Sequence, residues 1–263
     1  MTLPLLAANA ALVLALMTTL WLVSVRLRDA SIVDPFWSMA FLLVAAHTAL
    51  RTGLAPGKTL LLAAVAAWAL RLFVHLLLRS LGKPEDPRYA AFRARFGPEQ
   101  YWWFSFFQVF LLQGALVVVI SAPLQVAGAA PAPDPVSAFD LAGVLLFAVG
   151  LAIEAVADAQ LAAFRRARAG EGPDAPRRVL DTGLWRFSRH PNYFGEALVW
   201  WGFFFFALSH PWGWIGIVSP LYVTWFMNQG SATRMTDAYL HKHRPDYAAY
   251  AARVPAFWPR LWR

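Results

Sequence analysis

The chain reads Arg-His-Pro-Asn-Tyr-Phe-Gly-Glu from Arg189 to Glu196, and the apolar run 197–208 follows at once. Proline is well suited to the first turn of a helix, so this stretch predicts a membrane helix that begins at Pro191. The free amide groups and the positive dipole end of a helix start attract anions, and Arg189 and His190 stand directly beside them. The stretch therefore predicts a binding site for an anionic group.

Asn192 and Glu196 lie four residues apart and therefore share one face of this predicted helix. A carboxylate inside a membrane helix is costly to bury without a partner, so Glu196 needs a structural or a functional reason. One interpretation is a ligand-binding face. The alternative is a basic cluster that snorkels to the interface beside a hydrogen-bonded glutamate.

The composition indicates an integral membrane protein. With 263 residues, 59% hydrophobic and 14% charged, the chain is too apolar for an ordinary soluble domain and too long for a single anchor. It has no cysteine, which excludes disulfides and thiolate metal sites. His241 and His243 are two residues apart, a poor spacing for metal ligands on a helix, so no metal is expected. The net charge of +8 is explained by membrane topology, and no nucleic-acid partner is expected.

Seven apolar segments of suitable length predict an all-α fold, a single domain over residues 1–263 built of seven transmembrane helices. With the N-terminus outside, 20 of the 23 lysines and arginines fall on the inner side, so the C-terminus is expected in the cytoplasm. Residues 190–263 are expected to include the motif above and a C-terminal cytoplasmic cap. The predicted spans are Leu3–Val25, Ile32–Leu50, Thr59–Leu78, Phe104–Val126, Val136–Phe164, Pro191–Ser209 and Trp212–Ser231.

Polar residues inside the second and third spans are candidates for function. Asp34 precedes Pro35 at the start of the second span, where it would serve either as a helix N-cap or in chemistry. In the third span, Trp68, Arg71 and His75 recur at helical spacing. An embedded arginine needs a carboxylate or a bound anion as its partner.

The fifth span carries the most informative pattern. Glu154, Asp158 and Arg165 follow one another at positions i, i+4 and i+11, which puts them along one helix face. A purely structural pair between Arg71 and Asp158 is one interpretation. Because several acids are embedded in the fifth and sixth spans, we expect them to line a polar cavity.

The segment between the fifth and sixth spans is rich in arginine, whose forked donors match phosphate oxygens. This density predicts a ligand with several phosphates, although inner loops are basic in any case. The chain contains no Gly-x-Gly-x-x-Gly or P-loop pattern, so a nucleotide would bind among the helices. The arginines are Arg165, Arg166, Arg168, Arg177, Arg178, Arg186 and Arg189.

The longer string Gly-Leu-Trp-Arg-Phe-Ser-Arg-His-Pro-Asn-Tyr-Phe-Gly-Glu, residues 183–196, resembles the signature of the DUF1295 proteins. These are bacterial relatives of the steroid 5-alpha-reductases. The resemblance extends through Glu154-x-x-x-Asp158-x-Gln160 and Asp34-x-x-Trp37 to the aromatic tail around Tyr247. The core Arg-His-Pro-x-Tyr is shared with isoprenylcysteine carboxyl methyltransferases of the wider superfamily, whereas the ending Phe-Gly-Glu is more specific to the reductases.

The resemblance implies a reductase that binds NADPH from the cytoplasmic side of the bacterial inner membrane. It would reduce an activated C=C bond, an enone, in a lipophilic, steroid-like substrate. The implied cofactor-binding residues are Asp158, Arg165, Arg178, Arg189, His190, Asn192, Glu196 and Tyr247. Our own candidates for catalytic residues are Glu154, Asp34 and Tyr193, and our candidates for substrate contacts are Trp37 and Trp68.

Two departures from the steroid reductases concern the substrate site. The Gln-Glu pair that those enzymes carry in the second helix is absent, and Asp34 and Trp37 occupy the comparable region. A tyrosine of their third helix corresponds to Trp68 here. Enone reduction also needs a proton source, for which a buried Glu154 or Asp34 is our hypothesis.

Other function classes stay open at this point. A membrane methyltransferase using S-adenosylmethionine is compatible with the shared Arg-His-Pro core. Against it, Thr236-Asp237 stands where those enzymes carry an acidic pair, and the arginines exceed what a ligand without phosphates requires. A non-catalytic lipid- or sterol-binding protein is the other alternative. A transporter is disfavoured because we detect no internal repeat.

Overall fold

The computed structural model describes residues 2–130, 134–171 and 178–260, and within these ranges the chain is helical and contains no β-strand. The chain forms two compact units. Unit 1 comprises Met1–Leu141 and Phe204–Ser219, and unit 2 comprises Ala142–Phe203 and Pro220–Arg263. All-α architecture is thereby confirmed, while a single domain over the whole chain stays a prediction.

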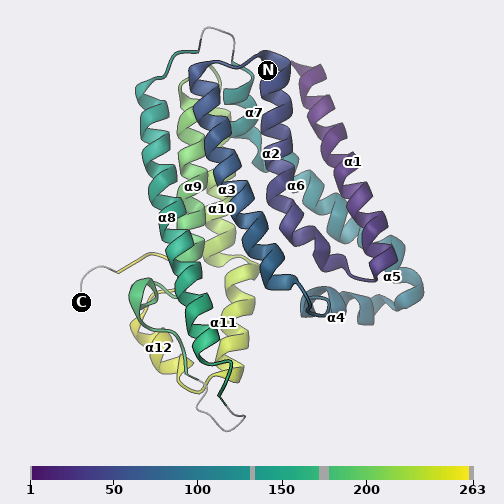
Figure 1. Ribbon diagram of the computed structural model, residues 1–263, viewed down its shortest axis with the longest axis vertical. Coiled ribbons are helices and arrows are strands. Elements are labelled where there is room, and N and C mark those ends of the chain that lie inside the picture. Colours follow the sequence, from purple (N-terminus) through teal and green to yellow (C-terminus); the bar gives the residue numbers. More distant parts are fainter. Residues whose placement is uncertain (1, 131–133, 172–177, 261–263) are drawn as a thin grey trace. The chain divides into compact units, whose positions relative to one another are not determined.

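Three long helices dominate the first half of unit 1: α1 (Leu3–Leu27), α2 (Val33–Thr52) and α3 (Pro56–Ser80). Helix α2 packs against both α1 and α3, as Figure 1 shows. Proline stands in the first turn of α1 and of α3, where its missing amide hydrogen leaves no helix bond unmade. Helix α1 ends at Arg28, whose positive φ of 57° gives the left-handed turn typical of a helix C-terminus.

The second half of unit 1 is more segmented. It contains α4 (Pro87–Phe96), α5 (Pro98–Ser105), a π-helical stretch (Phe106–Leu111), α6 (Leu112–Ile120) and α7 (Ala122–Gly128). The span predicted over Phe104–Val126 therefore begins earlier and is interrupted at Ser121, because Pro123 cannot continue the hydrogen-bond ladder of α6. Helix α7 is buried and packs against α2 and against the 3₁₀ turn Gly213–Ile217.

Three helices have residues in both units: α8 (Ala138–Ala167), α9 (Pro191–Leu208) and α10 (Val218–Gln229). Two further helices belong to unit 2 alone: α11 (Ser231–His243) and α12 (Tyr247–Arg253). Helix α9 begins at Pro191, as predicted. The seventh predicted segment, Trp212–Ser231, is a 3₁₀ turn followed by the shorter α10. Trp212 has a left-handed φ of 67°, which interrupts the α-helical path at the start of this segment.

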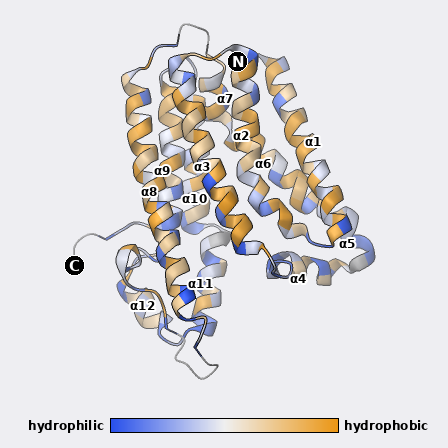
Figure 2. Cartoon of the chain, in the orientation of Figure 1, coloured by the Kyte–Doolittle hydropathy of each residue, from blue (hydrophilic) through white to orange (hydrophobic). Residues whose placement is uncertain are grey.

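Within the described residues, five helical segments are long and apolar enough to cross a membrane, and the chain is an integral membrane protein. These segments are Leu3–Leu27, Ala30–Thr52, Pro56–Ser80, Glu99–Ile120 and Ala138–Ala167. In Figure 2, hydrophobic colouring dominates α1, α2 and α3, whereas α4 and α11 are largely hydrophilic. The sixth and seventh spans and the orientation of the termini stay predictions. Helices α9 and α10 are not among the five segments. Asn192 and Glu196 lower the mean hydropathy of α9, and α10 has only 12 residues.

Helices α8 and α9 approach each other through glycines in unit 2. A Cβ atom added at Gly195 would lie 2.7 Å from the carbonyl oxygen of Gly150 and 2.7 Å from the backbone nitrogen of Glu154. At Gly202 it would lie 2.8 Å from the backbone nitrogen of Phe147. Small residues allow membrane helices to pack backbone to backbone, so these glycines bring the polar faces of α8 and α9 together.

The substitution Gly195→Ala is expected to separate α8 from α9 and to destabilise the protein by about 2 kcal/mol, because the obstructing atoms are backbone atoms that must move. Thermal unfolding in detergent measures the effect. Gly170→Ala is the matched control, since a Cβ atom there meets nothing within 4 Å. Equal melting temperatures for the two variants would contradict the close helix contact.

Candidate functional site

Where α8 meets α9 in unit 2, Asp158 and Asn192 are joined by a hydrogen bond, and Glu154 and Glu196 are buried one turn away on the same two helices. We call these four residues the polar cluster. Glu154 and Asp158 stand one turn apart on α8, and they are only 4% and 9% exposed. The Asn192 side chain donates from Nδ2 to Oδ1 of Asp158 at 3.2 Å. The carboxylate of Glu196, 5% exposed, accepts a hydrogen bond from the Trp200 indole at 2.9 Å. The otherwise apolar helices α8 and α9 thus carry a polar contact between them and two further buried acids beside it.

The amide oxygen of Asn192 is buried and has no hydrogen-bond partner among the residues that the structure describes. Its amide nitrogen is engaged by Asp158, which fixes the direction of the oxygen. A buried acceptor left without a donor is unfavourable and rare in folded proteins. This oxygen is therefore available to an N–H or O–H group of a ligand.

The loop that leads into α9 is fastened to α8 and α12. The side chain of Gln160 accepts from the backbone N–H of Leu184 at 3.0 Å, and the Trp185 indole donates to the carbonyl of Ala157 at 3.2 Å. Gly183 has a φ of 61°, and a Cβ atom there would collide with the Gln160 side chain. The Tyr250 hydroxyl donates to the carbonyl of Trp185 at 2.6 Å. Gln160 thus has a structural role in this loop.

Asp237 on α11 contacts the side chains of three residues, Arg189, His190 and Tyr247. We call these four residues the Asp237 clamp. The Asp237 carboxylate lies 2.7 Å from Nη2 of Arg189 and 2.9 Å from Nε2 of His190, and it accepts a hydrogen bond from the Tyr247 hydroxyl. The clamp joins the start of α9 to α11 and α12.

Backbone hydrogen bonds extend this attachment into the C-terminal segment. The N–H groups of Arg189 and His190 donate to the carbonyls of Pro255 and Ala256 at 2.9 and 3.1 Å. The Arg189 guanidinium also donates to the carbonyl of Ala251 at 3.0 Å. Residues 251–256 are therefore held against the entrance to α9.

The surroundings of Asp237 and Tyr247 keep the carboxyl group ionised and the phenol neutral. Burial favours a higher pKa for Asp237, but hydrogen bonds from His190 and Tyr247, together with the charge of Arg189, outweigh it and lower the pKa to about 2. Burial and the neighbouring carboxylate raise the pKa of Tyr247, which stays a neutral donor at neutral pH. Because a carboxylate only accepts, Nε2 of His190 carries its proton toward Asp237.

The other predicted residues of unit 2 lie around these two groups. The Tyr193 ring stacks on His190 with centroids 5.0 Å apart. Arg165 near the end of α8 and Arg178 are exposed. Arg177, one of the seven arginines of this segment, lies outside the described residues. Tyr193 is thus next to the clamp, and Arg165 and Arg178 are accessible to a ligand in solution.

The predicted residues of the second and third spans belong to unit 1. Asp34 lies inside the first turn of α2 and does not cap the helix. Its carboxylate accepts from Arg88 at 2.7 Å and from the Tyr89 hydroxyl at 2.5 Å. Trp37 and Trp68 both pack edge-on against Phe41, at centroid distances of 4.7 and 5.8 Å.

The sequence analysis does not identify Tyr89 as a partner of Asp34, or Asp237 as the partner of Arg189 and His190. Tyr89 lies in the short helix α4 between predicted spans, where no periodicity indicated a partner for Asp34. For Asp237 a signal existed, because Thr236-Asp237 had been singled out in the tail, but its three partners could not be identified from spacing.

Residues 20–254 match the family described as "Protein of unknown function (DUF1295)". The chain belongs to the DUF1295 family. An uncharacterised protein of Schizosaccharomyces pombe is 28% identical over 269 residues, which cover 92% of this chain and 76% of that protein. Steroid 5-alpha-reductase DET2 of Gossypium hirsutum is 35% identical over 108 residues, which cover 41% of this chain and 38% of that protein. The predicted resemblance to DUF1295 and to the steroid 5-alpha-reductases is confirmed.

Proposed function

We propose that this DUF1295 protein is an NADPH-dependent membrane reductase that reduces the activated C=C bond of an enone in a lipophilic, steroid-like substrate. The observation that carries the proposal is the buried polar cluster with the available acceptor of Asn192. The partial similarity to steroid 5-alpha-reductase DET2 supports the reaction class. We further propose seven spans, an outer N-terminus, and a cofactor side that faces the cytoplasm of a bacterial inner membrane.

The residues at the polar cluster fit a nicotinamide cofactor. The Asn192 side-chain oxygen is suited to accept a hydrogen bond from the carboxamide N–H of the nicotinamide. Asp158 orients the Asn192 side chain by accepting from its Nδ2. The exposed guanidinium groups of Arg165 and Arg178 are suited to phosphate oxygens. When bound, the cofactor supplies the hydride that is added to the β-carbon of the enone.

We assign an indirect role to Arg189, His190 and Tyr247. Their polar groups are engaged by Asp237, so they act as positioning residues for the start of α9 and thereby for Asn192. Tyr193, stacked on His190, contributes to the same arrangement. Direct cofactor contacts are then expected mainly from Asp158, Arg165, Asn192 and Glu196.

Glu154 is our proposed proton donor. Addition of a hydride to the β-carbon leaves an electron pair on the enolate, and one proton must be delivered to complete the reduction. Burial favours the neutral form of a carboxyl group, which is the form that can donate. Glu154 would transfer its proton, become a carboxylate and be reprotonated from water. Asp34, held by Arg88 and Tyr89, stays the second candidate.

The test is ligand-dependent thermal unfolding of the detergent-purified chain with NADPH and, separately, with S-adenosylmethionine. A ligand at 100 times its dissociation constant stabilises the folded state by about 2.7 kcal/mol, so NADPH alone is expected to raise the melting temperature. Arg165→Ala should abolish most of this shift. Arg166→Ala, the exposed neighbour on the same helix, is the matched control and should retain it.

Each other outcome contradicts the proposal in a different way. Stabilisation by S-adenosylmethionine alone would favour a membrane methyltransferase. No stabilisation by either compound would favour a lipid- or sterol-binding protein without catalysis. Equal loss of the NADPH shift in Arg165→Ala and Arg166→Ala would contradict the assigned phosphate contact and indicate a general charge effect.

A further inference from the structure

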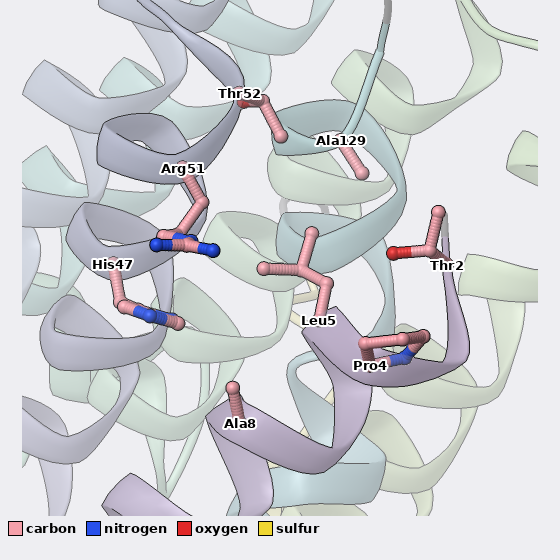
Figure 3. A pocket seen from close by; sticks show the side chains of 8 residues that line it. All are labelled: Thr2, Pro4, Leu5, Ala8, His47, Arg51, Thr52 and Ala129. Atoms are coloured by element: carbon pink, nitrogen blue, oxygen red, sulfur yellow. The ribbon is translucent and has the colours of Figure 1, made fainter.

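A pocket of about 560 Å³ opens in unit 1 between the N-terminal end of α1 and the C-terminal end of α2. Figure 3 shows Arg51 and His47 pointing from α2 toward Leu5 of α1. His47 follows Asp34 by 13 residues on the same helix, which is roughly 20 Å along the helix axis. This pocket is therefore separate from the ion pair of Asp34 with Arg88. It is lined by Thr2, Pro4, Leu5, Ala8, His47, Arg51, Thr52 and Ala129.

A buried hydrogen-bond network fixes the orientation of the His47 ring. Nδ2 of Asn9 donates to the Thr48 hydroxyl and to the Gln125 amide oxygen, both at 3.0 Å. The Asn9 oxygen therefore faces Nδ1 of His47, at 2.6 Å. Because an amide oxygen only accepts, Nδ1 carries a proton. The other ring nitrogen, Nε2, makes no hydrogen bond to the described residues and is available to a ligand.

Positive charge accumulates around this pocket. The Arg51 guanidinium is exposed and has neither an ion pair nor a hydrogen bond within the described part of the chain. Lys58, only 2% exposed, donates from Nζ to the Thr52 hydroxyl at 3.1 Å and to the carbonyls of Thr52 and Gly53 at 3.3 and 3.1 Å. These three oxygens are neutral, so they do not cancel the ammonium charge.

Two acidic residues at this end of unit 1, Asp134 and Asp140, are engaged elsewhere. Asp140 accepts from the backbone N–H and the hydroxyl of Ser137, both at 2.7 Å. Asp134 accepts from the backbone N–H of Lys58 at 2.9 Å, and its other oxygen lies 3.6 Å from Nε2 of His210. The field at the pocket mouth therefore favours an anion. The remaining wall, formed by Pro4, Leu5 and Ala8, is apolar and favours a hydrocarbon group.

We propose that this pocket binds the acidic head group of an anionic lipid. The Arg51 guanidinium donates to the phosphate oxygens, and Nε2 of His47 accepts a hydrogen bond from a hydroxyl group of the head group. Pro4, Leu5 and Ala8 contact the adjoining hydrocarbon. Helices α1 and α2 are both long enough to span a bilayer, and their ends at Leu3 and Thr52 are where head groups lie. Forked guanidinium donors match phosphate oxygens well. The site is independent of the proposed reductase activity.

The test is binding of phosphatidylglycerol to the detergent-purified full-length chain, followed by native mass spectrometry and by the shift in melting temperature. Wild type is expected to bind phosphatidylglycerol more tightly than phosphatidylcholine, and inorganic phosphate is expected to have little effect. Arg51→Gln should weaken the binding of phosphatidylglycerol about tenfold. Arg26→Gln is the matched control, since Arg26 is also exposed but lies in the last turn of α1.

A second variant tests the pocket without removing a charge. Ala8→Trp should fill the space beside Leu5 and reduce phosphatidylglycerol binding while the ligand-free melting temperature stays near that of wild type. The proposal is overturned if Arg51→Gln and Arg26→Gln lower binding equally, or if Ala8→Trp folds and binds normally. It is also overturned if inorganic phosphate stabilises as strongly as the lipid, because the hydrocarbon contact would then be irrelevant.

Discussion

Glu154→Gln is expected to lower the turnover of an enone substrate by about 100-fold or more, while the stabilisation by NADPH is retained. Glutamine keeps the size of the side chain and its place against α9, where Gly195 packs on the backbone of residue 154. It cannot, however, supply an acidic proton. The measurement is oxidation of NADPH in the presence of a 3-oxo-4-ene steroid, followed at saturating cofactor.

The matched control for this prediction is Glu99→Gln, an exposed glutamate at the start of α5, which should leave turnover unchanged. Full turnover in Glu154→Gln would exclude Glu154 as the proton donor and leave Asp34 as the candidate. A loss of NADPH binding in the same variant would also contradict the assigned role, because Glu154 would then act through the cofactor site. Both readouts are therefore needed.

The helices of this protein were largely predictable from sequence for simple physical reasons. A run of about 20 apolar residues suffices to cross a bilayer, and the predicted spans near Leu3, Ile32, Thr59 and Val136 agree with helices in the structure. Pro191 begins α9 because a proline in the first helical turn leaves no hydrogen bond unmade. The helical period likewise predicted that Glu154 and Asp158 share one face.

Long-range partners were not predictable in the same way. Asp34 pairs with Tyr89 across 55 positions, and Arg189 pairs with Asp237 across 48. Such pairs depend on how separate helices pack against each other. The helical period of a single segment gives no information about that packing. The prediction that Arg189 binds a phosphate rested on its charge, on its place beside the predicted helix start and on the family resemblance. In the structure Asp237 pairs with Arg189, so the Arg189 guanidinium is less available to a cofactor than the exposed Arg165 and Arg178.

Asp237→Asn is expected to destabilise the protein by about 3 kcal/mol, because it removes one partner of a largely buried ion pair. Arg189 and His190 are only 14% and 4% exposed at their side chains, so water cannot readily replace the lost carboxylate. The clamp holds residues 251–256 against α9, and we therefore expect faster tryptic cleavage at Arg253 as well as a lower melting temperature. Asp246→Asn is the control, since Asp246 is exposed and makes no side-chain capping bond.

Acid titration gives an independent measure of the same clamp. The pKa of Asp237 is lowered from its ordinary 3.8 to about 2 in the folded protein, so the folded state binds this proton less readily than the unfolded state. The resulting stabilisation, about 2 kcal/mol, is fully present above about pH 4 and is lost as the pH falls toward 2. Wild type should therefore lose most of its stability advantage over Asp237→Asn in this window. An advantage that is undiminished at pH 2 would show that the clamp does not depend on the ionised carboxylate. The attachment of residues 251–256 would then have to come from the backbone hydrogen bonds of Arg189 and His190.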